Sequence, residues 1–339
     1  MRRIGFILLF FVLAEGFLYA QPNLQRANIG FYNVENLFDT IDDPLKNDDQ
    51  FLPYGEYRWN TERYLNKLEK LSQVISEMSK MPGGLVVLGV SEIENESVLL
   101  DLVATEQLSP YHLKVCHHDS PDRRGVDVAF LYNPARFRIL STKAYSLYFP
   151  ENPDYITRDQ WLMSGILDDE DTVHLLVNHW PSKIGGEKKS LIYRLGAGKM
   201  ARHIADSIMA ISPNAKIIIM GDMNDNPNAK SMMEALRTRT NPKNLAPDDL
   251  YNPMWQMYRD GVGSYAYRDS WELLDNMIVS AGLVNPTHGY KFFMAHIFRK
   301  DFMLSQSGAY MNYPWRMFAG GIYQGGYSDH LPVYITLVK

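Results

Sequence analysis

The sequence predicts an α/β fold in which one edge of the sheet carries most of the polar chemistry. Apolar runs with strand character alternate with segments of helical periodicity along much of the chain. Several of the apolar runs end directly in acids, amides or histidines. The chain has 339 residues, 46% of them hydrophobic, which is enough for a large core. No repeat and no linker divides it, so we expect residues 27–339 to form a single domain.

The clearest strand is the run from Ile217 to Gly221, in the segment IIIMGDMNDN. Four successive apolar residues that end at a glycine are typical of a buried strand. Asp222 and Asn224 then lie where this strand leaves the core, which is a usual place for a ligand in an open α/β sheet. The alternative is an Asx-rich turn, because Asp and Asn also form turns for local reasons.

The first third of the chain alternates strand and helix patterns. Leu65, Leu68, Leu71, Ile75 and Met78 recur at helical spacing and predict one buried helix face. The expected elements are a strand from Ala27, a surface loop over Asp39 to Arg58, a helix over Thr61 to Met78, a strand over Leu85 to Val90 and a helix over Val98 to Leu108.

The remainder continues the pattern and becomes rich in aromatic residues after Tyr251. A basic segment that includes Lys183, Lys188, Lys189, Arg194, Lys199 and Arg202 leads into a helix ending near Ile211. Strands are expected within Asp122 to Tyr132 and over Phe137 to Tyr145, Trp161 to Leu167, Val173 to Asn178, Leu273 to Ser280 and Val333 to Val338.

Polar side chains recur where six of these strands end. They are Asn33, Glu92, His179, Asp222 with Asn224, Asp275, and Asp329 with His330. Six such endings indicate one convergent site. Carboxylate and amide oxygens suit a hard divalent ion that neutralises phosphate charge, and a histidine beside an aspartate can accept or donate a proton. The set therefore favours hydrolysis of a phosphate ester.

The ordered motifs resemble those of the endonuclease/exonuclease/phosphatase superfamily, and most of all its secreted bacterial endonuclease-like members. The motifs are NVEN, SEIEN, RRGVDVAFLY, VNHWPSK, GDMND, LDNMIVS and SDHLPV, and they span the chain from about residue 28 to its end. The resemblance implies a deoxyribonuclease I-like fold, a four-layer sandwich of two packed mixed β-sheets flanked by α-helices. It also implies a metal-dependent phosphoric ester hydrolase.

The resemblance assigns a role to each of these residues. It implies that Glu92 is the principal metal ligand and that Asn33 helps to hold the metal and orients the phosphate or a metal-bound water. It also implies that Asp329 is a further metal ligand or holds the catalytic water network. Asp222 would position or activate the attacking water, and Asn224 would hold a phosphate oxygen. His330 would contact the scissile phosphate, with Asp275 fixing its tautomer. His179 would lie near the leaving group as an acid or as a hydrogen-bond donor to phosphate.

Other residues are open to two interpretations. Glu94 is the alternative to Glu92 as metal ligand, and Glu35 is either a helper or a surface acid. Arg123 and Arg124 either grip the substrate phosphate, as arginine does well, or form a solvated turn. Lys183 and the lysines that follow it either face the phosphate or only keep a helix surface soluble.

The expected cofactor is Mg²⁺, with Mn²⁺ or Ca²⁺ as alternatives, and the leading substrate is DNA or RNA. A net charge of −5 gives no global cationic field for nucleic acid, so a local patch or metal ions must meet any polyanion. Phosphatases of inositol phosphates and hydrolases of sphingomyelin belong to the same superfamily and are the alternative. A binding module without activity would lack some of these acids or the last histidine. A two-carboxylate glycosidase leaves both histidines unexplained.

The pattern of residues 1–20 indicates a secretory signal peptide. Arg2 and Arg3 precede an apolar run from Ile4 to Leu13, and Ala20 precedes the expected cleavage point. We therefore expect export to the periplasm or beyond, with no transmembrane anchor in the mature chain and no stable protein partner. With Cys116 as its one cysteine, the chain forms no intramolecular disulfide.

Overall fold

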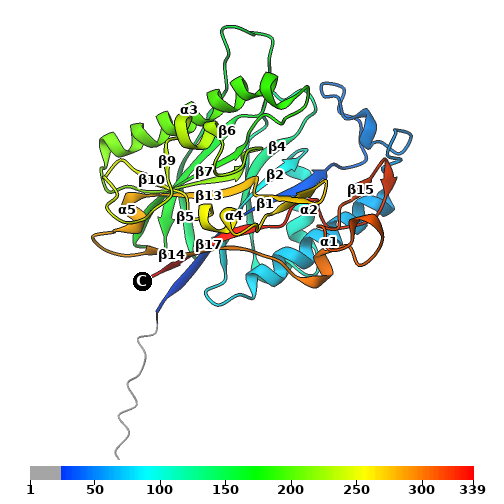
Figure 1. Cartoon of the computed structure of the whole chain (residues 1–339). Helices are drawn as coiled ribbons and strands as arrows, with labels where there is room; N and C mark the ends of the chain where they lie inside the picture. The colour runs from blue at the N-terminus through cyan, green and yellow to red at the C-terminus, as the bar shows by residue number, and fades with distance from the viewer. Residues whose placement is uncertain (1–23) are drawn as a thin grey trace, which may run out of the picture.

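A computed structural model describes residues 24–339 of the protein (Figure 1). The expected signal peptide lies outside these residues. Within them, no helix is both long enough and apolar enough to cross a membrane.

Two mixed β-sheets form the centre of the molecule. In the first sheet β1 and β2 run parallel and the other neighbours run antiparallel. In order across it, the strands are β14 (Lys291–Ile297), β17 (Val333–Val338), β1 (Arg26–Leu37), β2 (Leu85–Ile93), β4 (Asp127–Tyr132) and β3 (Lys114–His117).

The second sheet has seven strands, of which β7 and β8 run parallel, as do the short outer strands β10 and β9. In order across it, the strands are β5 (Phe137–Tyr145), β6 (Gln160–Leu167), β7 (Asp171–His179), β8 (Lys216–Asp222), β13 (Asp275–Ser280), β10 (Leu250–Tyr251) and β9 (Thr238–Arg239).

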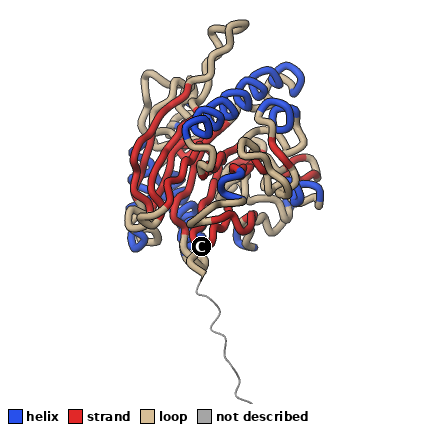
Figure 2. The backbone as a smooth tube through the Cα atoms, turned by 90° about the vertical axis from the view of Figure 1, so that its left-hand side faces the viewer, coloured by secondary structure: helices blue, strands red, loops and turns tan. Residues whose placement is uncertain are grey.

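Helices cover the outer faces of both sheets and so complete four layers (Figures 1 and 2). The helices α1 (Thr61–Ser79) and α2 (Glu96–Ala104) pack on the first sheet, and α3 (Glu187–Ile211) packs on the second. The smaller elements are η1 (Asp49–Phe51), η2 (Ser109–Tyr111), η3 (Ser231–Ala235), α4 (Trp255–Arg259), α5 (Ala281–Val284), η4 (Asp301–Met303), η5 (Gly308–Tyr310) and the strand pairs β11 (Tyr265–Tyr267) with β12 (Ser270–Glu272) and β15 (Phe318–Ala319) with β16 (Ile322–Tyr323).

The layers follow from the period-two alternation of side chains along a strand. On β8, Ile218 and Met220 face the first sheet, whereas Ile217 and Ile219 face α3. Both faces of this strand are therefore buried, which explains its uninterrupted apolar run. The four-layer fold expected from the resemblance is confirmed.

Three details of the sequence-based prediction are wrong. Leu65 lies on the outer side of α1 and is 57% exposed, so it is not part of the buried face. The helix predicted to reach Leu108 ends at Ala104. The strands β3 and β14 were not predicted, because both lie at sheet edges, where partial exposure weakens the apolar pattern.

We expect Phe130→Ala to lower the free energy of unfolding by about 3–5 kcal/mol. Phe130 is fully buried in the core between the two sheets, so its removal leaves a cavity. Phe293, which is 55% exposed, is the matched control, and its change to alanine should cost less than about 0.5 kcal/mol. Urea unfolding of the two variants measures both values, and equal destabilisation would contradict the assignment of the core.

Candidate active site

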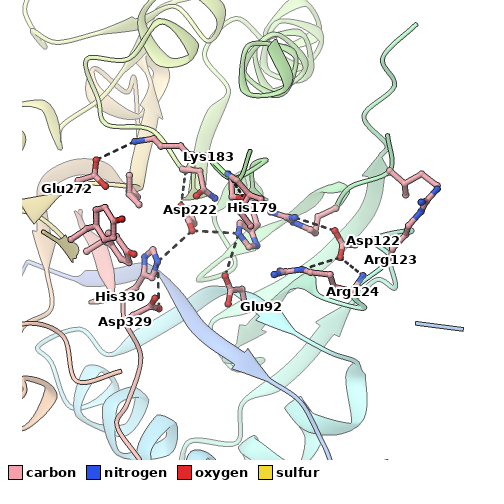
Figure 3. Close-up of a pocket in the computed structure, with 18 residues that line it drawn as sticks. Glu92, Asp122, Arg123, Arg124, His179, Lys183, Asp222, Glu272, Asp329 and His330 are labelled. Carbon is pink, nitrogen blue, oxygen red and sulfur yellow. Dashed lines mark hydrogen bonds and ion pairs between the residues drawn. The ribbon is translucent and has the colours of Figure 1, made fainter. Parts of the chain in front are cut away.

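A cavity of about 640 Å³ lies where the strand ends of the two sheets meet (Figure 3). Nine of the predicted site residues line it, namely Glu92, Arg123, Arg124, His179, Lys183, Asp222, Asn224, Asp329 and His330. The other two, Asn33 and Asp275, are buried and hydrogen-bond to residues that line it. The structure thus brings all the predicted residues together, while their catalytic roles remain predictions.

His330 and Asp275 form a buried pair in this cavity. The Nδ1 of His330 donates to Oδ2 of Asp275 over 2.7 Å, and the hydroxyl of Ser264 donates to the same oxygen. Burial alone lowers the pKa of His330, but the carboxylates of Asp275, Asp222 and Asp329 outweigh burial and raise it well above 6.5. The imidazolium can therefore present its Nε2–H to an anion in the cavity.

Asp222 lies beside this pair because β8 and β13 place it opposite Asp275. Its Oδ2 is 3.9 Å from Nε2 of His330, and its Oδ1 accepts the backbone N–H of Asn224 over 2.8 Å. Burial and the neighbouring carboxylates raise the pKa of Asp222 to about 7, although His330 acts to lower it. A carboxylate with this pKa is suited to accept a proton near neutrality.

His179 and Asn33 complete the floor of the cavity. The Nε2 of His179 is 3.7 Å from Oε1 of Glu92 and 3.7 Å from Oδ2 of Asp222. Burial, then Arg158 and Arg124, lower the pKa of His179 well below 6.5, so this ring is neutral at pH 7. The Nδ2 of Asn33 donates to Glu92 and to Asp222, whereas its Oδ1 accepts from the backbone of Glu35. Asn33 therefore orients the two acids, and its oxygen does not face them.

A distortion of β2 separates Glu92 from Glu94. Glu92 has a φ of 62°, and the register of β2 against β4 shifts between Ser91 and Ile93. This bulge breaks the alternation that would turn both acids to one side. Glu92 lines the cavity, whereas Glu94 is buried against the backbone N–H of Asp39 at 2.7 Å. Of the two candidate ligands, Glu92 is thus the one in the cavity.

Glu35 is not a surface acid. It is 8% exposed and accepts the backbone N–H of Met317 over 2.7 Å. Burial and Asp329 raise the pKa of Glu35 to about 8, whereas the fully buried Lys67 acts to lower it. Lys67 donates to the carbonyl of Tyr327, two residues before Asp329, so this buried lysine is anchored to the segment that carries Asp329 and His330.

The donor set at the floor fits a hard divalent ion. One ligand atom from each of Glu92, His179 and Asp222 lies within 4.8 Å of the other two. A separation of 3.7 Å is too long for a hydrogen bond between His179 and either acid. Within residues 24–339, Nδ1 of His179 also has no hydrogen-bond partner. Within residues 24–339, no lysine or arginine forms an ion pair with Glu92 or Asp222. A bound divalent ion would stabilise these two closely spaced carboxylates.

Arginines form one wall of the cavity. The predicted residues Arg123 and Arg124 line it, and they are joined by Arg158, which the sequence analysis missed. Arg158 is 8% exposed, pairs with Asp122 at 3.3 Å and donates to the carbonyl of Trp180 over 3.0 Å. A charged residue just before the buried strand β6 was the available signal, but it lay outside every recognised motif.

Of the basic segment before and within α3, Lys183 lines this cavity. Arg194 is fully buried, with its Nε 2.8 Å from Asp225 and its guanidinium donating to the carbonyl of Ser182. Arg194 thus joins the loop that carries Lys183 to the loop that follows Asp222. Arg202 is also buried. The lysines that follow Lys183, namely Lys188, Lys189 and Lys199, are exposed on α3 and do not line the cavity, which favours the interpretation that they keep a helix surface soluble.

The four-layer fold and the cluster of acids and histidines are together those expected of a phosphoric ester hydrolase. A model of the endonuclease/exonuclease/phosphatase family matches residues 28–339, and the chain belongs to that family. No curated protein matches the chain significantly.

Three solved structures illustrate the shared fold. TDP2 from D. rerio, complexed with a single-strand DNA product, has a TM-score of 0.55 at 11% identity and covers 92% of this chain and 98% of its own. A family member from Bacteroides thetaiotaomicron has a TM-score of 0.52 at 16% identity, covering 93% and 98%. The human Nocturnin catalytic domain with bound sulfate has a TM-score of 0.54 at 13% identity, covering 92% and 94%.

We expect the ring of His330 in metal-free protein to titrate above pH 6.5, and Asp275→Asn to lower its pKa. The variant removes the strongest influence that raises this pKa. Because the folded-state pKa is raised, the stabilisation is complete below pH 6.5 and is lost as the pH rises through the folded-state value. Nitrogen-15 NMR of the histidine rings measures the titration.

The same spectra contain an internal comparison. His174 is largely buried without a carboxylate partner, and burial lowers its pKa below 6.5. A His330 ring that titrates on the same side of 6.5 as His174, or that is unaffected by Asp275→Asn, would contradict the proposed ion pair.

Proposed function

We propose that the protein is a divalent-metal-dependent phosphodiesterase that hydrolyses nucleic acid. The observation that carries this proposal is the convergence of Glu92, Asp222 and the His330–Asp275 pair on one cavity with an arginine wall. The family supports hydrolysis of a phosphoric ester, and the cavity supplies both acids and cations for it.

Glu92 would hold the ion, with Asp329 as a further oxygen ligand, while Asp222 would act on the attacking water. When bound, a divalent ion such as Mg²⁺ neutralises phosphate charge and polarises the phosphorus–oxygen bonds. Asn33 keeps Glu92 and Asp222 in place through its two hydrogen bonds.

The side chains of the cavity account for the proton and the charge. The oxygen of a water molecule bonds to phosphorus as the bond to the leaving oxygen breaks, and Asp222 accepts the proton of the water. The Nε2–H of His330 donates to a non-bridging phosphate oxygen and stabilises its growing charge. Since His179 is neutral, it serves as a hydrogen-bond donor near the leaving oxygen, which takes its proton from solvent.

Purified residues 21–339 should nick supercoiled plasmid with Mg²⁺ or Mn²⁺ and should lose this activity in EDTA. We expect His330→Ala to lower the rate by about 10²–10⁴-fold, which is the usual range for a positioned acid–base group. His203→Ala is the matched control, because His203 is exposed on α3 away from the cavity, and it should keep the wild-type rate. Full activity of His330→Ala, or activity in EDTA, would contradict the proposal.

We also propose that the chain is exported. The basic and apolar pattern of residues 1–20 supports this. When the full chain is expressed in a Gram-negative host, mass spectrometry of the periplasmic fraction should find a mature protein that begins at Gln21. Full-length protein confined to the cytoplasm would contradict export.

A further inference from the structure

The hairpin of β11 and β12 forms a second wall of the cavity, and its chemistry differs from that of the arginine wall. Tyr265 and Tyr267 lie two positions apart on β11 and so share a face. Glu272 pairs directly with Tyr265 across the hairpin, and all three residues line the cavity. The opposite face is held to the core, where Ala266 is 1% exposed and Trp271 packs against buried side chains.

This wall leaves apolar surface open at the mouth of the cavity. Tyr267 is 50% exposed, and Ile184 on the loop before α3 is 82% exposed, yet both line the cavity. The two segments that carry them meet where Lys183 lies 3.4 Å from Glu272, as Figure 3 shows. An occupant of this side must therefore offer flat or apolar surface together with groups that hydrogen-bond to a lysine and a carboxylate.

A quaternary ammonium group, such as the choline of a phospholipid, fits this wall poorly. Aromatic rings bind such cations through their faces. Positive charge is already present at both rings, because the guanidinium of Arg268 lies 5.1 Å from the ring centroid of Tyr267 and that of Arg316 lies 6.0 Å from the ring centroid of Tyr265. The charge of Glu272 is met by Lys183. A further cation would meet three positive groups, Arg268, Arg316 and Lys183, against two acids, Glu272 and Asp329.

A polyphosphorylated inositol fits poorly for a different reason. It is a polyol that carries anionic groups around its ring, so it would cover neither Tyr267 nor Ile184 with apolar surface. Any phosphate on this side of the cavity would also be repelled by the carboxylate of Glu272. A nucleobase is uncharged, its flat faces can lie against the tyrosine ring or against the guanidinium of Arg268, and its polar edge can hydrogen-bond to Lys183 and Glu272.

We infer that the face formed by Tyr265, Tyr267 and Glu272, together with Lys183 and Ile184, is a nucleobase subsite. The base on one side of the scissile phosphate lies against Tyr267, while the arginine wall receives the phosphates on the other side. This inference rests on the proposed function, since it identifies the substrate of the same cavity as a nucleotide chain.

The test uses single-stranded oligonucleotides in which one central phosphodiester is cleavable and all other linkages are phosphorothioates. Two analogues carry an abasic tetrahydrofuran residue, one on the 5′ side and one on the 3′ side of the cleavable bond. For the wild type, loss of the base on one side should lower kcat/KM by about tenfold or more, which is the value of one stacking contact. Loss of the base on the other side should matter less.

We compare kcat/KM for the parent strand with kcat/KM for the abasic strand that the wild type cleaves more slowly. In Tyr267→Ala these two values should be nearly equal, so that their ratio is close to one. Tyr267→Phe, which keeps the ring, should retain the wild-type ratio. Tyr310→Ala is the matched control, because Tyr310 is 45% exposed outside the cavity. Wild-type enzyme that cleaves both abasic strands as well as the parent, or an unchanged ratio in Tyr267→Ala, would overturn the inference.

Two further substrates separate failure of this inference from failure of the proposed function. Sphingomyelin in phosphatidylcholine vesicles and inositol 1,4,5-trisphosphate are assayed with the same enzyme and metal. Cleavage of all the oligonucleotides without dependence on the base would overturn the nucleobase subsite and leave the proposed function intact. Hydrolysis of sphingomyelin or the inositol phosphate without cleavage of any oligonucleotide would overturn both the subsite and nucleic acid as the substrate, and would leave only a metal-dependent phosphoesterase. If none of these esters were hydrolysed, the proposed function itself would be wrong.

Discussion

The site depends on a cluster of buried charges that neither sheet holds alone. Asp222 and Asp275 come from the second sheet, whereas Asn33 and Glu92 come from the first. His330 lies just before β17, which is also a strand of the first sheet. Removing one partner from a buried ion pair costs about 3–5 kcal/mol, because the other charge is left without compensation. The packing of the two sheets and the geometry of the cluster are therefore linked.

Around this floor the cavity has two unlike walls. Arginines from the segment before β4 and from the loop before β6 supply positive charge on one side. On the other side the hairpin supplies tyrosine rings and one carboxylate. Such an arrangement distinguishes the two sides of a phosphodiester, which a uniformly basic groove would not do. It would also allow a chain with a net charge of −5 to bind the proposed polyanionic substrate, since the positive charge is local.

The sequence was most informative where a strand is buried on both faces and ends in polar groups. The run before Asp222 predicted β8 and its site because an uninterrupted apolar strand has few alternatives. The motif series predicted the whole floor of the cavity. The sequence could not decide between Glu92 and Glu94, because that choice depends on a bulge in β2. It could not predict that Arg158 and the face of the β11–β12 hairpin line the cavity, because tertiary contacts bring them there. The alternation of Tyr265 and Tyr267 before the turn at Arg268 was a readable hairpin signal.

Whether the acid and histidine cluster is one metal-dependent site is decided by diffraction from crystals of residues 21–339 grown with Mn²⁺ and inorganic phosphate. The anomalous signal locates the ion independently of any activity. Our account predicts a Mn²⁺ peak in the cavity beside the Glu92 carboxylate, with phosphate within hydrogen-bond distance of Nε2 of His330. Mn²⁺ bound elsewhere, or a cavity without the ion at saturating concentration, would contradict it.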